Sequence, residues 1–573
     1  RSQTGITTTS SAPANYATLN PLSKSSNTTF TLSDGNLTLN AEDVGMEATL
    51  RASTGKFYFE TKLIDWYSSG DFICSLGAGR VPERGGSGGS GNSLFYPAYT
   101  GYNFTSGVRI GTDGSAQGIF SLGTQTLTKN TGWALGDMIG VAVDCDRKKL
   151  QIYHNGAKLG NECDLPSGES EFSFYAFAQG NVGDSSEIEV NFGQKPFKYA
   201  PPQGFLPLNS ATVRPNKVIA RPDQYVGVTL YTGNGGTQSI NSLNMDPDLV
   251  WIKNRDESVS HFLYDSVRGA NKYLRSDGNF AEDTGSSNEL SFIHKGFTVN
   301  GAGGGVNKNT IDFVSWAWKA GGNKNTFNID DVGYATAAAA GLNGGTATVT
   351  GASVGTKQGF SIIKFHTAGT NSGATISHGL SKSPDLIVAK ALNVTLNWKI
   401  YHSSLGNDYF LEFDSDAKYN VSNYWGVTSS VFEADASGDL DLGSPGCISY
   451  IWHDIPGLQK FGKYVGNNNA NGPYVELGFR PALLWVKRTD STGNWVILDT
   501  RRNPSNPVTI SAYADTAADG NYDPGQDWAD ILSNGFKIRA TYGEVNASSG
   551  DYIYCAWAEA PASNLFGGQS NAR

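Results

Sequence analysis

The chain has 573 residues, long enough for several domains, and its formal net charge of −10 comes from interspersed acidic and basic residues. This pattern argues against nucleic-acid binding, which would need clustered basic residues. Seventy glycines, 12% aromatic residues and three methionines favour an all-β, turn-rich chain over a helical one. No apolar run approaches the ~18 residues that cross a bilayer, so we expect no membrane insertion.

The five cysteines are an odd number and show no Cys-x-x-Cys spacing. Cys74, Cys145 and Cys555 lie in apolar, strand-like runs, so we expect buried thiols rather than a disulfide framework. Stability must then come from the cores of the domains, which suits synthesis in a reducing compartment.

Residues 1–28 are rich in Ser, Thr, Asn and Pro and are expected to form a flexible N-terminal arm. Residues 31–39 alternate around Asp34-Gly35-Asn36, which predicts a hairpin. Residues 137–144 alternate again, and a strand at 150–153 ends at the turn signal Asn155-Gly156. This stretch therefore predicts two adjacent antiparallel strands with their turns.

Five motifs in chain order resemble the SPRY (B30.2-like) domain family. They are K-x-Y-F-E at 56–60, G-D-x-I-G-V-A-x-D-x-D at 136–146, L-x-x-Y-x-N-G-x-x-L-G at 150–160, N-F-G-Q-x-P-F at 191–197 and P-x-G-F at 202–205. The resemblance covers about residues 32–209 and places a domain at 29–210. It implies a two-sheet β-sandwich that binds ligands through its loops, without catalysis.

One loop of this domain departs from the family by a Gly/Ser-rich insert at 85–91, followed by an aromatic run. Aromatic rings on loops offer apolar contact area at low entropic cost, which suits recognition of carbohydrate or protein. Phe95, Tyr96 and Tyr99 are therefore the candidate ligand-binding residues. Tyr102 and Phe104 are instead expected to lie in the core of the next strand.

The remainder of the chain repeats itself. Pro-Asp-Leu-Val-Trp-Ile-Lys at 247–253 is echoed at 384–390 and at 481–487, and each copy is followed by a second strand and by a closing aromatic strand. This predicts three related β-sandwich or jelly-roll-like modules. We place the modules at 224–321, 358–457 and 458–562, a Gly/Ala-rich connector without core residues at 322–357, and a C-terminal tail at 563–573.

Four tryptophans of these modules are interpreted as core residues. Trp316 and Trp318 share one face of a strand, and Trp251 and Trp485 occupy the same position in their modules. Packing explains such equivalence better than a sugar-binding platform does. His402 matches Asp265 and Asp499 in the sister modules, which favours surface variation over catalysis.

Sites for metal or catalysis have weak support. The seven histidines show no zinc-ligand spacing, and a Gly-x-Ser-x-Gly run at 85–89 lacks the strand and helix of a nucleophile elbow. Oxygen donors near residue 520 have the spacing of a calcium loop, although Pro524 replaces the required glycine. The candidate calcium ligands are Asp519, Asn521, Asp523, Asp527 and Asp530; we expect no other cofactor.

An SPRY-like domain followed by such modules resembles tail-fibre-like or virion structural proteins of marine bacteriophages. The resemblance implies a non-enzymatic virion protein, synthesised in the host cytoplasm, that recognises a host surface glycan or protein and contacts other virion proteins. By analogy it also implies a homotrimer docked through the N-terminal arm. The alternatives are a capsid decoration or other virion structural protein, and a polysaccharide-degrading enzyme whose paired carboxylates no sequence pattern would reveal.

Overall fold

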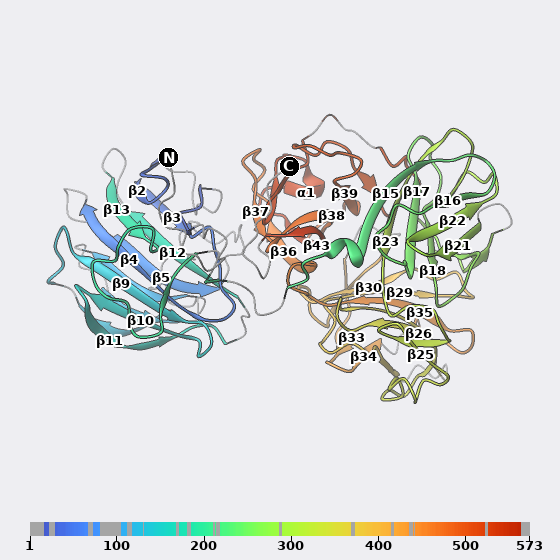
Figure 1. Ribbon diagram of the computed structural model, residues 1–573, viewed down its shortest axis with the longest axis horizontal. Coiled ribbons are helices and arrows are strands. Elements are labelled where there is room, and N and C mark those ends of the chain that lie inside the picture. Colours follow the sequence, from blue (N-terminus) through green and yellow to red (C-terminus); the bar gives the residue numbers. More distant parts are fainter. Residues whose placement is uncertain are drawn as a thin grey trace, which may run out of the picture. The chain divides into compact units, whose positions relative to one another are not determined.

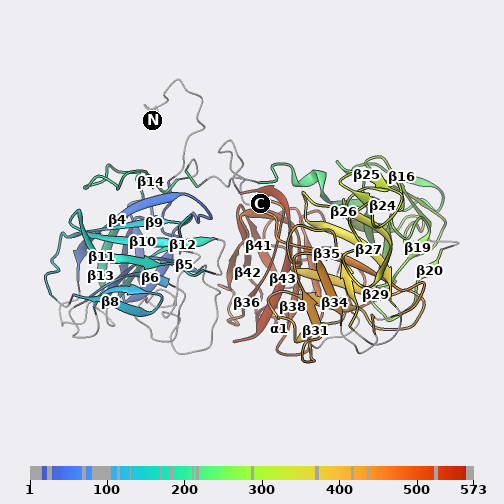
Figure 2. The ribbon, with the colours of Figure 1, turned by 90° about the horizontal axis from the view of Figure 1, so that it is seen from below.

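The computed structural model describes residues 16–21, 29–66, 73–80, 105–111, 117–129, 131–167, 171–179, 185–209, 212–213, 218–285, 289–367, 373–413, 418–434, 439–440, 442–521, 525 and 527–562. The chain divides into two compact units, at residues 1–217 and 218–562. Nearly all regular structure in the described ranges is β (Figures 1 and 2), and the one α-helix there is α1, Gly543–Asn546. The expected fold class, an SPRY-like sandwich followed by three related β modules, is confirmed.

Unit 1 is a sandwich of two mainly antiparallel sheets. The first sheet contains, in spatial order, β1 (Phe30–Ser33), β2 (Thr38–Ala41), β13 (Ser186–Asn191), β4 (Lys56–Asp65), β9 (Met138–Asp144), β10 (Lys149–His154) and β11 (Ala157–Asp164), with β14 (Leu206–Pro207) parallel to β4. The second contains β3 (Asp43–Glu47), β12 (Phe172–Gln179), β5 (Ile73–Arg80), β6 (Thr105–Gly111), β7 (Gly118–Ser121) and β8 (Thr124–Thr128).

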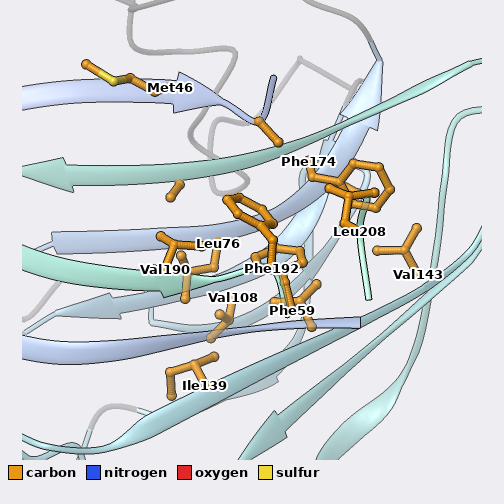
Figure 3. Close-up of a cluster of buried hydrophobic side chains, with 14 of the residues drawn as sticks. Met46, Phe59, Leu76, Val108, Ile139, Val143, Phe174, Val190, Phe192 and Leu208 are labelled. Atoms are coloured by element: carbon orange, nitrogen blue, oxygen red, sulfur yellow. The ribbon is translucent and has the colours of Figure 1, made fainter. Parts of the chain in front are cut away.

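Alternate residues of both sheets fill the core between them. Phe59, Val143 and Val190 from the first sheet meet Leu76 and Phe174 from the second (Figure 3). Because strand side chains point alternately to opposite faces, the alternation in residues 137–144 places Ile139, Val141 and Val143 on the face of β9 that packs in the core. All five cysteines of the chain are buried free thiols, which confirms the expectation for Cys74, Cys145 and Cys555.

Two of the family motifs have visible physical roles. Asn155 and Gly156 both have positive φ, 49° and 80°, which the two-residue turn between β10 and β11 requires. A Cβ on Gly156 would also lie 2.5 Å from the ring of Tyr199. Glu60, which closes the K-x-Y-F-E motif, is fully buried and accepts hydrogen bonds from the amides of Lys198 (2.7 Å) and Tyr199 (2.9 Å). It thereby fixes the chain that follows N-F-G-Q-x-P-F.

Unit 2 consists of three modules with one strand order, which appear as green, yellow-to-orange and orange-to-red lobes in Figure 1. The inner sheets run β15 (Val226–Thr232), β23 (Asp312–Trp318), β17 (Leu249–Asn254), β18 (Phe262–Asp265) in module 1; β27 (Phe360–His366), β35 (Cys447–Trp452), β29 (Leu386–Ala391), β30 (Lys399–His402) in module 2; and β36 (Gln459–Val465), β43 (Asp551–Pro561), β38 (Phe479–Arg488), β39 (Val496–Asp499) in module 3.

Each inner sheet is covered by a three-stranded outer sheet of matching order. The outer sheets are β16 (Gln238–Ile240), β22 (Gly296–Asn300), β21 (Glu289–Ile293); β28 (Thr375–Ser377), β34 (Val431–Ala434), β33 (Trp425–Val427); and β37 (Tyr474–Glu476), β42 (Gly535–Ile538), β41 (Ala529–Leu532). Further strands extend the modules: β19 (Lys272–Tyr273) and β20 (Asp283–Thr284) in module 1, β31 (Tyr409–Leu411) and β32 (Lys418–Asn420) in module 2, and β40 (Ala512–Tyr513) in module 3.

The repeated Pro-Asp-Leu-Val-Trp-Ile-Lys motif forms a strand that is buried on both faces. In β17, Val250 and Ile252 point into the core of module 1, whereas Leu249 and Trp251 point into a core shared by all three modules. Strands β29 and β38 divide their residues in the same way. A strand covered on both faces needs an uninterrupted apolar run, which is why the motif does not alternate.

Three equivalent tryptophans meet at the centre of the shared core. Trp318, Trp452 and Trp557 come from the closing strands β23, β35 and β43 and are at most 1% exposed. Their ring centroids lie 6.1, 5.5 and 5.9 Å apart, and every pair is edge-to-face at 67–71°. Such pairs contribute about 0.5–1.5 kcal/mol each beyond the area they bury. We call these residues the tryptophan triad.

A cyclic set of hydrogen bonds joins the three modules. One ring nitrogen at the start of each second strand donates to a backbone carbonyl of a neighbouring module. The pairs are His261 Nε2 with Tyr513 O (2.8 Å), Trp398 Nε1 with Arg275 O (2.9 Å) and Trp495 Nε1 with Glu412 O (2.9 Å). Because module 1 bonds to 3, 2 to 1 and 3 to 2, the three modules close into a ring.

The connector expected at 322–357 is instead part of module 2. It forms β24 (Phe327–Ile329), β25 (Val332–Tyr334) and β26 (Thr348–Gly355), and β26 pairs with β27 along its length. Phe327, Val349 and Val354 are buried in the module 2 core. The expectation of a segment without core residues was wrong because the few apolar residues among its Gly, Ala and Thr are buried when β26 pairs with β27.

Removing a member of the triad should destabilise all three modules. We expect Trp557→Ala to lower the free energy of unfolding of unit 2 by about 3–5 kcal/mol, the usual cost of a large aromatic cavity. Hydrogen exchange on the full chain should show loss of protection in all three modules, with Leu230→Ala, on an exposed side chain, as the control. Loss confined to module 3 would contradict the shared core.

Candidate functional site

The predicted ligand residues Phe95, Tyr96 and Tyr99 lie outside the described residues. The described surface of unit 1 carries another aromatic feature, at the entry to β9 and the turn after β10. It consists of Lys129, Trp133, Leu135, Asp137 and His154, which we call the Trp133 patch. Trp133 and His154 are partly exposed, and Leu135 is 48% exposed.

Two side chains lie close to the ring of Trp133. Lys129 Nζ lies 4.7 Å from the centre of the indole, and the His154 ring lies 4.8 Å away. The indole Nε1 donates to Lys129 O at 3.0 Å, so the polar edge of the ring is satisfied within the protein. A partly exposed ring with a fixed orientation can stack on a ligand with little loss of side-chain entropy.

Asp137 organises the polar side of the patch. Its carboxylate contacts His154 Nε2 (2.8 Å), Asn155 Nδ2 (2.8 Å) and the Ala134 amide (2.8 Å). Burial alone would raise the pKa of Asp137, but these hydrogen bonds outweigh it and hold the pKa below its usual value. The patch therefore presents an indole and an apolar side chain beside a fixed negative charge.

The candidate calcium ligands are only partly described. Asn521 Oδ1 accepts from Arg255 Nε at 2.9 Å, and Asp530 Oδ2 accepts from Arg539 Nη1 at 2.7 Å. Asp519 Oδ1 accepts from the amide of Asn521 at 3.1 Å. Asp527 precedes β41, and Asp523 lies outside the described residues.

Within the described ranges, no group of three or more His, Cys, Asp or Glu side chains is arranged to hold a metal ion. Of the calcium candidates, Asn521 and Asp530 accept hydrogen bonds from arginines. The calcium site stays a prediction.

The lysines that end the three repeated motifs are buried and bonded to carbonyls. Lys253 Nζ donates to Ala517 O (3.2 Å), and Lys390 Nζ donates to Asn279 O (3.3 Å), in each case across a module boundary. Lys487 Nζ donates to Gly493 O. Burial lowers the pKa of Lys253 to about 8. Equivalent placement in three modules indicates a structural role.

Asp265 and Asp499 form a second repeated feature. Each pairs with an arginine three residues later, Arg268 Nε at 2.5 Å and Arg502 Nε at 2.6 Å, with all four side chains fully buried. The aspartates also accept from neighbouring modules, from Tyr450 Oη (2.7 Å) and Trp316 Nε1 (3.1 Å) respectively.

His402 takes this position in module 2, where Leu405 replaces the arginine. It donates from Nε2 to Tyr554 O of module 3 at 3.2 Å and is fully buried. The expected surface variation was therefore wrong, because the position lies in the module interface. Burial lowers the pKa of His402 to about 4, so a neutral imidazole stands where the sister modules have ion pairs.

Asp385 and Asp454 are two neighbouring acidic residues of module 2. The Asp454 amide donates to Asp385 Oδ2 at 2.7 Å, and Asp454 Oδ1 accepts from the Phe461 amide at 2.8 Å. Burial and the nearby Asp385 raise the pKa of Asp454 to about 8. In module 1 the Ala320 amide donates to Asp248 Oδ2 in the equivalent place, at 2.8 Å. The bond to Asp385 is thus part of the repeated strand closure.

The raised pKa of Asp454 predicts a pH effect on stability. The Asp454 carboxyl group ionises near pH 3.8 in the unfolded chain and near pH 8 in the folded chain. Between these values the folded state holds a proton that the unfolded state has lost, so the free energy of unfolding falls as the pH rises. Asp454→Asn removes this ionisable group. The melting temperature of the variant should therefore exceed that of wild type by a margin that grows as the pH rises from 3.8 to 8. Thermal unfolding of both proteins across this range tests the effect, and a pH-independent difference would contradict it.

Sequence reasoning missed the Trp133 patch and the module-spanning polar groups. Trp133 lies four residues before the alternating run at 137–144, where the sequence does not distinguish it from the residues that lead into a strand. The lysines ending the repeated motifs were visible as well, and their recurrence after apolar runs was the signal for burial. Which carbonyls receive them depends on how the modules pack.

Unit 2 matches a known protein family. A family model described as "Domain of unknown function (DUF7483)" matches residues 221–561, more than half of the chain. The chain belongs to this family. The matched span coincides with the three-module ring, so the DUF7483 domain includes all three modules.

Two curated relatives match shorter stretches. The ATP-dependent RNA helicase DDX1 of Xenopus laevis is 27% identical over 170 residues, 29% of this chain and 21% of the helicase. The E3 ubiquitin-protein ligase RKP of Arabidopsis thaliana is 31% identical over 109 residues, 17% of this chain and 8% of the ligase. The chain thus spans about a fifth or less of the length of these relatives.

Solved structures similar to this chain each cover 31% of it. They are the SPRY domain of human HERC1 (TM-score 0.24, 13% identity, 99% of that chain), the TRIM65 PSpry domain (0.22, 11%, 92%) and the carbohydrate-binding module CBM66 of Bacillus subtilis (0.21, 9%, 94%). Within the described residues, no helix is long and apolar enough to cross a membrane.

Proposed function

We propose that the chain is a non-enzymatic virion protein of the tail-fibre or receptor-binding type, in which unit 1 recognises a host surface glycan or protein. The Trp133 patch carries the proposal. A partly exposed indole in contact with Lys129 and His154, and near the exposed Leu135, is suited to stacking on a sugar ring or an apolar side chain. The bacteriophage resemblance of the motifs supplies the biological setting.

The interior of the DUF7483 domain supports a scaffold rather than a reaction centre. The buried lysines that end its repeated motifs donate to backbone carbonyls, and the buried Asp265 and Asp499 pair with arginines in two of the three modules. Groups that occupy equivalent places in repeated modules serve what the modules share, which is packing. Such a scaffold would offer a surface that other virion proteins contact.

The closed ring favours a second candidate, a capsid decoration or structural protein. Each module buries its inner sheet against the other two, so the DUF7483 domain needs no second copy of the chain to complete its core. A monomer that packs on other virion subunits would fit this geometry. A homotrimeric fibre would need a further interface.

Binding to host cells distinguishes the two candidates. Trp133→Ala in the full chain should weaken saturable binding to host cells about thirtyfold, which corresponds to the loss of about 2 kcal/mol typical of a central aromatic contact. Binding is measured with labelled protein, and light scattering gives the mass of the same sample.

Phe280→Ala is the matched control, because Phe280 is a 42% exposed ring in the DUF7483 domain, and it should leave binding unchanged. Equal binding by Trp133→Ala and wild type would remove the patch from the account. A monomer that binds no host cell would favour the decoration role.

A further inference from the structure

Module 2 buries a lysine where its sister modules have apolar residues. Lys399 lies in β30, on the face that points between the two sheets of module 2, and its side chain is 7% exposed. The equivalent positions hold Phe262 and Val496, which belong to the cores of modules 1 and 3. The repeated architecture therefore does not require a charge here.

Two carboxylates surround the amine of Lys399. Its Nζ lies 2.6 Å from Glu412 Oε1 and 2.9 Å from Asp439 Oδ2, and the centre of the Phe410 ring is 4.4 Å away. Glu412 Oε2 accepts from Asn397 Nδ2 at 2.9 Å. The Glu412 side chain is 4% exposed and that of Asp439 is 29% exposed.

Lys399, Glu412 and Asp439 place three charges at the largely apolar core of module 2. Burial would lower the pKa of Lys399, but the hydrogen bonds that its ammonium donates to Glu412 and Asp439 outweigh this effect and keep the pKa above its usual value. Removing charged groups from water is unfavourable, and the attraction among the three ions has to offset it. A covalent bond between the amine and one carboxyl group would remove two of the three charges.

We propose that Lys399 and Asp439 condense to an intramolecular isopeptide bond, with Glu412 as the proton carrier. An amine 2.9 Å from a carboxylate oxygen is within reach of the carboxyl carbon, since reacting atoms held about 3–3.5 Å apart are in attack geometry. The bond is a self-modification, and it is independent of the ligand that unit 1 binds.

The reaction needs no external reagent. The Lys399 ammonium gives one proton through Glu412 to the Asp439 carboxylate, and the neutral amine then attacks Cγ of the acid. Glu412 accepts a second proton from the attacking nitrogen and returns it to the departing hydroxyl. One C–N bond forms, one C–O bond breaks, one water leaves, and Glu412 ends ionised as it began.

The surroundings assign the two carboxyl groups to different roles. Glu412 is the more buried and is fixed from its other oxygen by Asn397, which suits a group that only exchanges protons. Asp439 is the more exposed, so the released water can escape. The bond would tie β30 of the inner sheet to the crossover between β34 of the outer sheet and β35, and so cross-link the sandwich of module 2.

Mass spectrometry of the intact, denatured chain tests the proposal. We expect the wild-type chain to be one water lighter than its sequence, and trypsin to yield a branched peptide that joins Lys399 to Asp439. Lys399→Met and Glu412→Gln should have their full sequence masses. Asp439→Asn should lose ammonia instead of water, because the amide nitrogen is then the leaving group.

A wild-type chain at its full sequence mass would overturn the proposal, and this reading needs no variant to fold. A water loss that persists in Asp439→Asn would overturn the assignment of Asp439. Lys253 is the matched control residue, because it is also buried but donates to carbonyls. It should be recovered in a linear peptide.

Discussion

The edge-to-face contact among Trp318, Trp452 and Trp557 is the interaction on which the DUF7483 domain depends. Each module is a small two-sheet sandwich whose inner sheet is apolar on both faces. Only one face can be covered by the outer sheet of the module, so the other must meet apolar surface elsewhere. Three such faces meet around the triad, and the hydrogen bonds from His261, Trp398 and Trp495 join each module to a neighbour.

Equivalent positions in the three modules also carry similar buried polar groups, and module 2 departs from this pattern. Modules 1 and 3 use buried aspartate–arginine pairs where module 2 has the neutral His402. Module 2 also has three added strands at 327–355 and the buried Lys399. Departures from a repeated pattern mark positions that packing alone does not explain, and Lys399, with two carboxylates at its amine, is the departure with the most specific chemistry.

Much of this architecture could be predicted from local sequence. The repeated motifs identify three related modules, and the Asn155-Gly156 turn identifies the hairpin of unit 1, because turn chemistry and apolar patterns act over a few residues. The strand at 348–355 was missed because its small residues lack an apolar pattern and are held by pairing with β27. The burial of His402 and the contacts of Lys399 could not be predicted, since they depend on which faces of distant segments meet. At the candidate site, Trp133 can be identified in the sequence. Its contacts with Lys129 and His154 could not be predicted, because they depend on how the segments around β9 and β10 fold together.

Differential scanning calorimetry of the full chain tests the shared core most directly. If the three modules fold only around a common triad, residues 218–562 unfold in one transition, so the chain shows two transitions, one for each compact unit. The transition of residues 218–562 should have a calorimetric enthalpy equal to its van't Hoff enthalpy. Separate transitions for the individual modules would show that each is stable alone, and would contradict the account.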